Sequence, residues 1–132
     1  MVGMEVLLIQ RHPSKPFGRH WAVPAGKLEP GENSLEAMVR ELSEEVGIRA
    51  DPADAVLLND NMVTTSRQRF RFVTYVVQFN EKPLLVPNNG EVIAADWVDC
   101  RVVRKRRVIP HFWDGKSAQR IAEVIEKAEI RC

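Results

Sequence analysis

Cysteine is almost absent from this chain: Cys100 and Cys132 are the two among 132 residues. Two cysteines make neither a disulfide framework nor a four-ligand zinc site, so we expect reduced thiols without a catalytic role. The sequence also lacks an apolar run long enough to cross a bilayer and a signal-peptide pattern at its start. These absences predict a cytoplasmic protein without a membrane partner, and the length fits one domain, residues 1–132.

Net charge is small as well. A formal charge of +1 gives no overall attraction to nucleic acid, so a nucleic-acid partner is not expected. The charges are nevertheless unevenly placed, because residues 101–107 include five basic side chains and residues 29–45 are strongly acidic. A basic run of this kind is most often solvated surface, and the alternative is a surface that faces phosphates.

One helix is well marked over residues 34–46. Asn33 is a good N-cap with Glu36 three residues further on, and Gly47 supplies a left-handed stop. Apolar residues recur at three- and four-residue intervals and predict the buried stripe: Leu35, Met38, Val39, Leu42 and Val46. The helix is therefore expected to pack one face on the rest of the domain.

Apolar and β-branched runs before and after this helix predict strands. Their ranges are 4–10, 21–24, 55–58, 69–79 and 95–98. A second amphipathic helix is expected over 117–130. Strands interleaved with two helices predict an α/β (α+β) fold, in which a mixed sheet is flanked by helices.

Glycine, glutamate and arginine stand at fixed spacing between residues 26 and 48. The fixed positions are Gly26, Glu32, Arg40, Glu41, Glu44, Glu45 and Gly47. This spacing resembles the Nudix box, the signature of the Nudix hydrolase family, without a departure, and so many fixed positions make a chance match rare. The resemblance implies the α/β/α sandwich of Nudix domains. The first strand of that fold is shortened or missing here, which implies a truncated start or an edge completed otherwise, for example by a second copy in a homodimer.

Three carboxylates of this pattern are expected on one side of the helix, opposite its apolar stripe: Glu41, Glu44 and Glu45. Like charges held together raise carboxylate pKa values unless a cation relieves them, and hard oxygen ligands favour magnesium or manganese. A solvated acidic face is the other interpretation, which the neighbouring box positions disfavour. By resemblance, these residues hold Mg²⁺, with Mn²⁺ as an option, which bridges substrate phosphates and activates a water.

Other box residues are expected to support this site. Arg40 is expected to pair with Glu32 or Glu44 and so to fix the carboxylates. Gly26 permits close backbone approach, and its carbonyl is implied as a further metal ligand by the relatives.

A later loop is expected to add one more carboxylate. Glu91 lies six residues before Trp97 and matches the corresponding position of MutT-like members, whereas Glu81 is the weaker candidate. A surface carboxylate is the alternative interpretation of Glu91. The general base differs among family members and is left open here among Glu44, Glu91 and Glu41.

Side chains outside the box are candidates for substrate contacts. They are Arg11, Arg19, Trp21, Arg69 and Arg71. The arginines either meet phosphates with two hydrogen bonds each or lie in solvent. The tryptophan either stacks on a base or anchors the core.

The substrate class follows from resemblance alone. Markers of ADP-ribose, dinucleoside polyphosphate, NADH and coenzyme A pyrophosphatases are missing after the box, and residues 5–98 resemble the MutT-like branch. That implies a small nucleotide, a (deoxy)nucleoside triphosphate, from which water attack on phosphorus releases a monophosphate and pyrophosphate. An RNA 5′-end pyrophosphohydrolase, a nucleotide-sugar or ADP-ribose pyrophosphatase, and a non-catalytic nucleotide sensor remain as alternatives.

Overall fold

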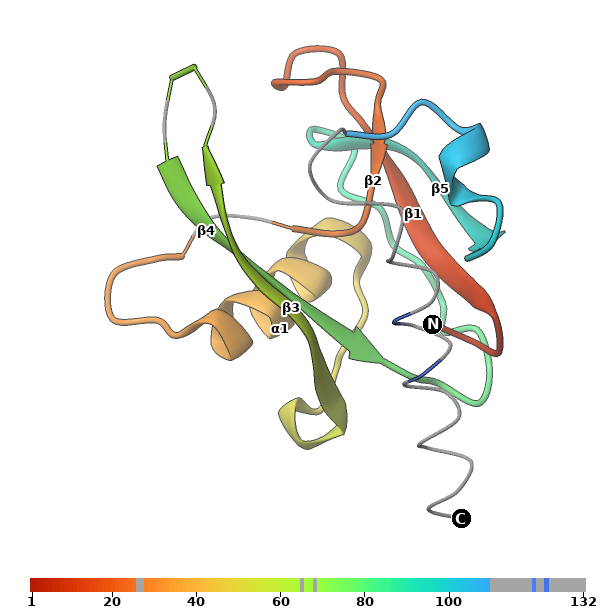
Figure 1. Ribbon diagram of the computed structural model, residues 1–132. Helices are drawn as coiled ribbons and strands as arrows, with labels where there is room; N and C mark the ends of the chain where they lie inside the picture. Colours follow the sequence, from red (N-terminus) through yellow and green to blue (C-terminus); the bar gives the residue numbers. More distant parts are fainter. Residues whose placement is uncertain (26–27, 65, 68, 110–119, 121–122, 124–132) are drawn as a thin grey trace.

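Eight elements make up the part of the chain that the computed structural model describes, residues 1–25, 28–64, 66–67, 69–109, 120 and 123 (Figure 1). They are β1 (Glu5–Arg11), β2 (Trp21–Ala22), α1 (Ser34–Val46), η1 (Pro52–Asp54), β3 (Ala55–Thr64), β4 (Arg69–Val77), β5 (Val92–Asp99) and η2 (Val103–Lys105). The helix expected over 117–130 falls almost wholly outside the described residues, and Gly26 does so entirely. No helix in the described part is long and apolar enough to span a bilayer.

The helix α1 begins and ends where the sequence predicts. The Asn33 side chain accepts a hydrogen bond from the Glu36 N–H at 2.9 Å, which caps the first turn. Gly47 has φ 72°, and its N–H bonds back to the last turn. Local sequence signals at both ends therefore determine this element.

The strands form two antiparallel sheets. One has the order β2-β1-β5 and the other contains β3 and β4. The sequence predicts one mixed sheet, but the parallel contact among the described residues is a single bridge between Trp21 and Val108. Only four residues separate β3 from β4 in the sequence, which suits the antiparallel pairing of these two strands. The strand β3 also extends beyond its predicted end at residue 58, since pairing with β4 accommodates the polar residues 59–61 that interrupt the apolar pattern.

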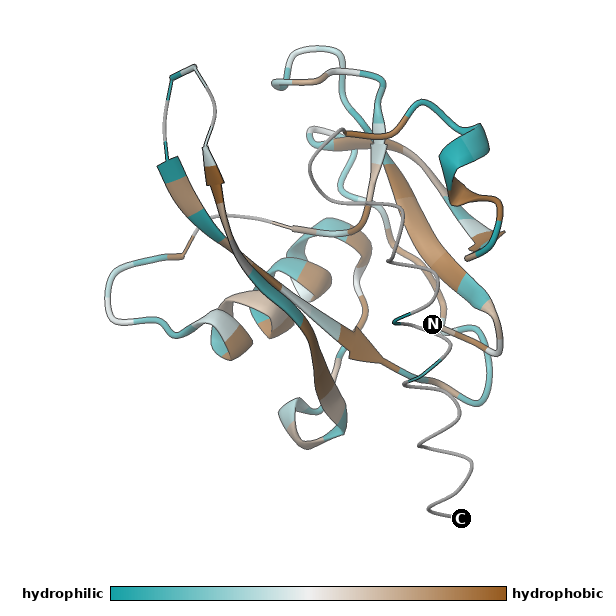
Figure 2. Cartoon of the chain, viewed as in Figure 1, coloured by the Kyte–Doolittle hydropathy of each residue, from teal (hydrophilic) through white to brown (hydrophobic). Residues whose placement is uncertain are grey.

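The strand β1 separates two hydrophobic clusters. Val6 and Leu8 belong to one cluster, and Leu7 and Ile9 belong to the other. Successive side chains of a strand point to opposite faces, so a strand covered on both faces needs a continuous apolar run. Figure 2 shows β1 as such an apolar strand.

The helix α1 connects the two sheets. At its C-terminal end Val46 is fully buried and packs in one cluster with Ile9 and Val92 of the first sheet. At its N-terminal end the Ser34 hydroxyl lies 2.7 Å from the hydroxyl of Tyr75 in β4. Both ends of the helix are thus fixed, and Figure 1 shows α1 beside the β3–β4 pair.

No strand precedes β1 among the described residues apart from the bridge between Val2 and Glu5. The Met1 ammonium donates to the Val77 carbonyl instead, and the Phe79 N–H donates to the Met1 carbonyl at 2.8 Å. The end of β4 is thereby covered by the same chain. A homodimer stays a prediction that these contacts do not test.

Candidate active site

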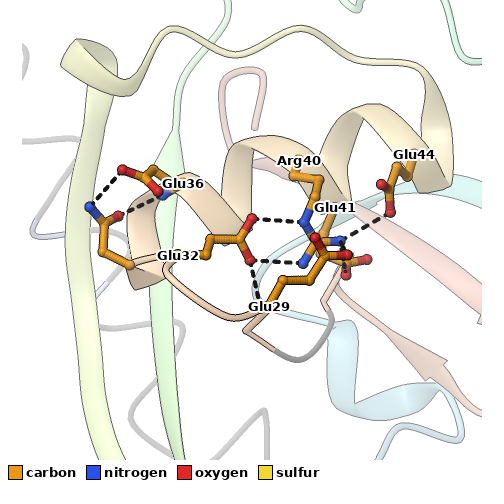
Figure 3. Close-up of polar contacts among 7 residues, drawn as sticks. Glu29, Glu32, Glu36, Arg40, Glu41 and Glu44 are labelled. Atoms are coloured by element: carbon orange, nitrogen blue, oxygen red, sulfur yellow. Dashed lines mark hydrogen bonds and ion pairs between the residues drawn. The ribbon is translucent and has the colours of Figure 1, made fainter.

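Arg40 lies at the centre of the acidic cluster on α1 (Figure 3). Its Nε and Nη2 donate to the two carboxylate oxygens of Glu32 at 2.8 and 3.0 Å. Its Nη1 donates to Glu41 Oε1 at 2.7 Å and to Glu44 Oε2 at 3.1 Å, while Glu29 lies 3.6 Å away. The expected pairing is present with both Glu32 and Glu44, and it extends to a further carboxylate.

The bonds between Arg40 and Glu32 favour the ionised form of both side chains. The Arg40 guanidinium, helped by the Glu29 N–H, lowers the pKa of Glu32, and the Glu32 carboxylate in turn raises the pKa of Arg40. The side chains of Arg40, Glu32 and Glu41 are 20%, 12% and 13% exposed. One partly buried cation therefore offsets the repulsion among several glutamates.

Glu45 has a different environment. It is 5% exposed, and the Ala25 N–H donates to its Oε2 at 3.1 Å. The pKa of Glu45 is raised to about 8, mainly by burial and also by the Glu41 and Glu91 carboxylates, while the Ala25 N–H and Arg11 oppose the shift. Near neutral pH this carboxyl group is partly protonated unless a cation replaces the proton.

The structure corrects the prediction that all three carboxylates of the helix lie opposite its buried apolar stripe, because Glu45 is itself buried. Glu44 is 55% exposed and Glu41 is partly buried, whereas Glu45 lies inside the domain beside Val46. The reason is tertiary, because the segment at Pro24 and the loop that carries Glu91 cover this side of the helix. Helical periodicity alone gives no information about which other segments of the chain cover the helix.

A loop before β5 is attached to the C-terminal end of α1. The Val86 N–H donates to the Val46 carbonyl at 2.7 Å, and the Asn88 N–H donates to the Glu45 carbonyl at 2.8 Å. These carbonyls belong to the last turn of α1, which has no intrahelical partners for them. A Cβ at Gly47 would lie 2.9 Å from the Val86 Cβ, so glycine is needed there for close packing as well as for its φ.

The same loop places Glu91 next to the helix. The Glu91 N–H donates to the Asn88 carbonyl at 3.0 Å, and the Glu91 carbonyl accepts from the His12 N–H at 2.9 Å. Both backbone groups of Glu91 are thus fixed. Its carboxylate lies close enough to Glu45 to raise the pKa of Glu45, so the structure brings together two acidic residues that are far apart in sequence.

One cleft collects these side chains. Glu41, Glu45 and Glu91 line it, together with Arg11 of β1 and Arg71 of β4. Its rim includes Lys15, Pro16 and Phe17 of the loop between β1 and β2. Acidic and basic groups therefore face a common space of the kind that receives a ligand.

Two of the arginines predicted to bind substrate line this cleft. The Arg11 Nε donates to the Pro16 carbonyl at 2.8 Å, and its charge reaches Glu45. Arg71 bonds through two nitrogens to the carboxylate of Asp60 on β3, with Nε 2.7 Å from Oδ1. Arg71 thus already has an anionic partner, whereas Arg11 retains donors for a substrate.

The other three predicted substrate residues are not among those that line the cleft in the described part of the chain. Arg69 is exposed at the start of β4, and Arg19 is exposed with φ 64°. Trp21 packs against a hydrophobic cluster, and the Arg106 guanidinium lies 4.5 Å from the centre of its ring. The structure therefore favours the core interpretation of Trp21.

The side chains that are candidates for metal binding suit a hard divalent cation. All candidates with side-chain donors are carboxylates, and the buried one carries a raised pKa that a cation would relieve. Among residues outside the masked segments, no three acidic, histidine or cysteine side chains converge as a preformed metal site. Arg40 holds Glu41 and Glu44, which explains why the carboxylates do not converge.

Three contributors to the site have no clear signal in the sequence. Ala25 and Asn88 act through backbone N–H groups, which every residue except proline possesses. Tyr75 positions the helix through its hydroxyl. It is the one tyrosine of the chain, but its partner Ser34 is visible only once α1 is placed beside β4.

Comparison with known proteins gives a family. A model of the NUDIX domain matches residues 2–116. An 8-oxo-dGDP phosphatase of Danio rerio is 41% identical over 113 residues, which are 86% of this chain and 29% of that protein. An RNA pyrophosphohydrolase of Erythrobacter litoralis is 47% identical over 51 residues, 39% of this chain and 30% of that protein. The chain thus spans less than a third of the length of these curated relatives.

Solved structures agree with this match. A Nudix hydrolase from M. smegmatis, RenU, superposes with a TM-score of 0.71 and 26% identity, covering 93% of this chain and 76% of that one. A C. elegans Ap4A hydrolase gives a TM-score of 0.73 at 19% identity, covering 93% of this chain and 87% of that one, and shows the fold alone. The fold expected from the box is confirmed.

Proposed function

This chain belongs to the Nudix hydrolase family, and on that basis we propose that it hydrolyses a diphosphate bond of a (deoxy)nucleoside triphosphate. Water attacks phosphorus, an oxygen–phosphorus bond forms, the bridging bond breaks, and a monophosphate and pyrophosphate leave. The observation that supports this proposal is the buried carboxyl group of Glu45 in a cleft with Glu41, Glu91 and Arg11. Acidic groups that suit a cation and a basic group that suits a phosphate share one space.

Nudix hydrolases generally use divalent metal ions. We assign the binding of Mg²⁺ or Mn²⁺ to the carboxylates of Glu41, Glu44, Glu45 and Glu91 and to the Gly26 carbonyl. When bound, the ion would neutralise phosphate charge and lower the pKa of a coordinated water. Arg40 contributes by holding the carboxylates of Glu41 and Glu44 in fixed positions through its hydrogen bonds to them.

Glu91 is the best-placed general base of the three candidates. Glu41 and Glu44 both accept hydrogen bonds from Arg40, so an oxygen of each carboxylate is already occupied. The side chain of Glu91 has no hydrogen bond or ion pair within the described residues, and it faces the cleft. Its backbone is fixed on both sides, which suits a group that must meet a water in one place.

Arg11 is the proposed contact to the phosphates. It lies at the end of β1 and lines the cleft near Glu45. Its Nε is used by the Pro16 carbonyl, which orients the side chain and leaves the terminal nitrogens for phosphate oxygens.

The test is a hydrolysis assay with Mg²⁺ over nucleoside and deoxynucleoside triphosphates, nucleotide sugars, ADP-ribose and 5′-triphosphorylated RNA. We expect a monophosphate and pyrophosphate from the triphosphates. In water enriched in ¹⁸O, the label should enter one phosphate product and not the sugar, because the attack is on phosphorus. Tight nucleotide binding without turnover would instead identify a non-catalytic sensor.

An RNA 5′-end pyrophosphohydrolase is the second candidate. Such an enzyme cleaves the same kind of diphosphate bond, so the same cleft suits its substrate. Relatives named RNA pyrophosphohydrolase favour it.

A further inference from the structure

A series of side-chain contacts leads from the rim of the cleft to η2. Phe17, which lines the rim, packs edge-on against His20 with ring centres 5.7 Å apart. The Arg107 Nε donates to the His20 Nε2 at 3.2 Å. The loop between β1 and β2 and the segment after η2 therefore form one continuous surface.

This surface rests on a rigid support. Val103 of η2 is fully buried in a hydrophobic cluster. The Trp21 N–H donates to the Arg107 carbonyl at 2.8 Å, and the Ile109 N–H donates to the Trp21 carbonyl at 3.0 Å. The backbone at Val103 and Arg107 is thus held in place, although the side chain of Arg107 is exposed.

The basic side chains of this region fall into two groups. Arg101 and Arg106 bind Asp99 and Asp96, so their charges are balanced. The cations of the second group, Arg19, Arg104, Lys105 and Arg107, have no carboxylate partner within the described residues, and together with Phe17 and His20 we call them the basic surface. Figure 2 shows η2 in hydrophilic colours, and in Figure 1 it lies on the far side of β1 from α1.

Unbalanced positive charge beside an exposed aromatic ring is the combination that binds single-stranded nucleic acid. Cationic side chains follow the phosphates, and an aromatic ring stacks on an unpaired base. Phe17 is 45% exposed and stands between the cleft and the cations. The residues of η2 are not among those that line the cleft in the described part of the chain, so a nucleotide bound there by its phosphates does not need these cations.

We propose that the basic surface binds the strand of a 5′-polyphosphorylated RNA, downstream of the terminal nucleotide whose phosphates occupy the cleft. This inference rests on the proposed function, because it places the reacting phosphates beside Glu45. It also revises the expectation drawn from the small net charge. The acidic residues of α1 cancel the basic surface in the sum but lie on another side of the molecule.

Binding of RNA as a function of salt tests the basic surface. The probe is a labelled 5′-triphosphorylated single strand of about ten nucleotides, measured by fluorescence anisotropy without metal. Neutralisation of three phosphates predicts a slope near −2 in log K against log salt, at about −0.7 per phosphate, and hence roughly 20-fold weaker binding between 50 and 200 mM. We expect Arg104→Glu to weaken binding at least tenfold and to reduce the slope by about 0.7 or more.

Arg49→Glu is the matched control. Arg49 is also exposed, follows α1 outside the basic surface, and its replacement changes the net charge by the same amount. It should leave RNA affinity within about twofold. Equal losses of RNA affinity in both variants, or RNA binding that does not depend on salt, would overturn the proposal. It would also be overturned if the wild type bound anionic vesicles instead of RNA and Arg104→Glu abolished that binding.

Turnover separates this inference from the proposed function. Arg104→Glu should keep the wild-type rate on nucleoside triphosphates and raise the KM for triphosphorylated RNA. If the wild type hydrolyses nucleotides and the Arg104→Glu change leaves the turnover of RNA unaltered, the proposal for the basic surface fails and the proposed function stands. If the wild type hydrolyses neither substrate, the proposed function itself fails.

Discussion

The acidic cluster of α1 and the basic surface carry opposite charges and are built in opposite ways. In the cluster, Arg40 binds three carboxylates at 3.1 Å or less, and its members are mostly shielded from water. On the basic surface, Arg104 and Lys105 are exposed and have no anionic partner in the described part of the chain.

The difference indicates two functions, one in catalysis and one in binding. Groups that are fixed before the substrate arrives suit the stabilisation of a transition state, because no reorganisation is needed during the reaction. Unbalanced exposed charges suit the capture of a polyanion, where affinity depends on ion release rather than on fixed geometry. Changes in the acidic cluster should therefore affect catalysis and stability, and changes in the basic surface should affect binding alone.

Removal of divalent ions should separate the two regions most completely. We expect exhaustive chelation to abolish nucleotide hydrolysis and magnesium to restore it, because the proposed nucleophile depends on the ion. Binding of RNA to the basic surface should persist in the chelator. Hydrolysis that survives chelation would contradict the assignment of the acidic cluster.

Glu44→Gln should give the next largest effect. We expect kcat to fall about a thousandfold or more, since a carboxylate that binds the ion acts mainly in the transition state. The side chain is 55% exposed, so the free energy of unfolding should change by less than about 1 kcal/mol. Glu36→Gln makes the same chemical change outside the cluster and should retain near-normal turnover, and equal rates in the two variants would disprove the role of Glu44.

Arg40→Gln should damage stability as well as activity. The change leaves Glu32, whose side chain is 12% exposed, without its charged partner. Because the change removes the hydrogen bonds between these charged groups, we expect a lower midpoint of urea unfolding than in the wild type. The pKa of Glu32 should also rise toward its ordinary value, which NMR titration of the carboxyl carbon can follow. An unchanged midpoint would show that the network in Figure 3 adds nothing to the fold.

Gly47→Ala tests how the cluster is joined to Glu91. A residue with a Cβ is strained at φ 72°, and the Cβ would lie 2.9 Å from that of Val86. We expect a loss of about 1–2 kcal/mol from these two effects. Because Val86 begins the loop that carries Glu91, kcat should fall as well. Gly31→Ala is the control, since Gly31 also has a positive φ of 80° but no atom within 4 Å of its Cβ, so it should lose stability with less effect on kcat.

The sequence predicts α1 and its caps because those signals are local. Asn33, Glu36 and Gly47 act within a few residues of one another, and each does in the structure what its residue type favours. The Arg40 pairing is predictable for the same reason, since three of its partners lie within one or two turns of the helix or just before it.

The burial of Glu45 is not predictable in this way. It depends on the Ala25 N–H and on a loop more than forty residues later, and neither contact is determined by the type of residue involved. The sequence leaves Trp21 open between a substrate contact and a core role, and the contact with Arg106 that favours the core role also joins distant segments. The net charge is a weak guide to partners for a related reason, because a sum over the chain contains no information on which side of the molecule each charge lies.

Arg104→Gln should have the smallest effect on the fold, and this is what distinguishes it from Arg40→Gln. Both variants replace one arginine by the same neutral side chain. Arg104 has no partner among the described residues and is exposed, so we expect urea unfolding to change by less than about 0.5 kcal/mol. Nucleotide turnover should also remain at the wild-type rate. A loss of stability as large as that of Arg40→Gln would mean that the basic surface is a structural network like the acidic cluster, and the division of work between the two regions would no longer hold.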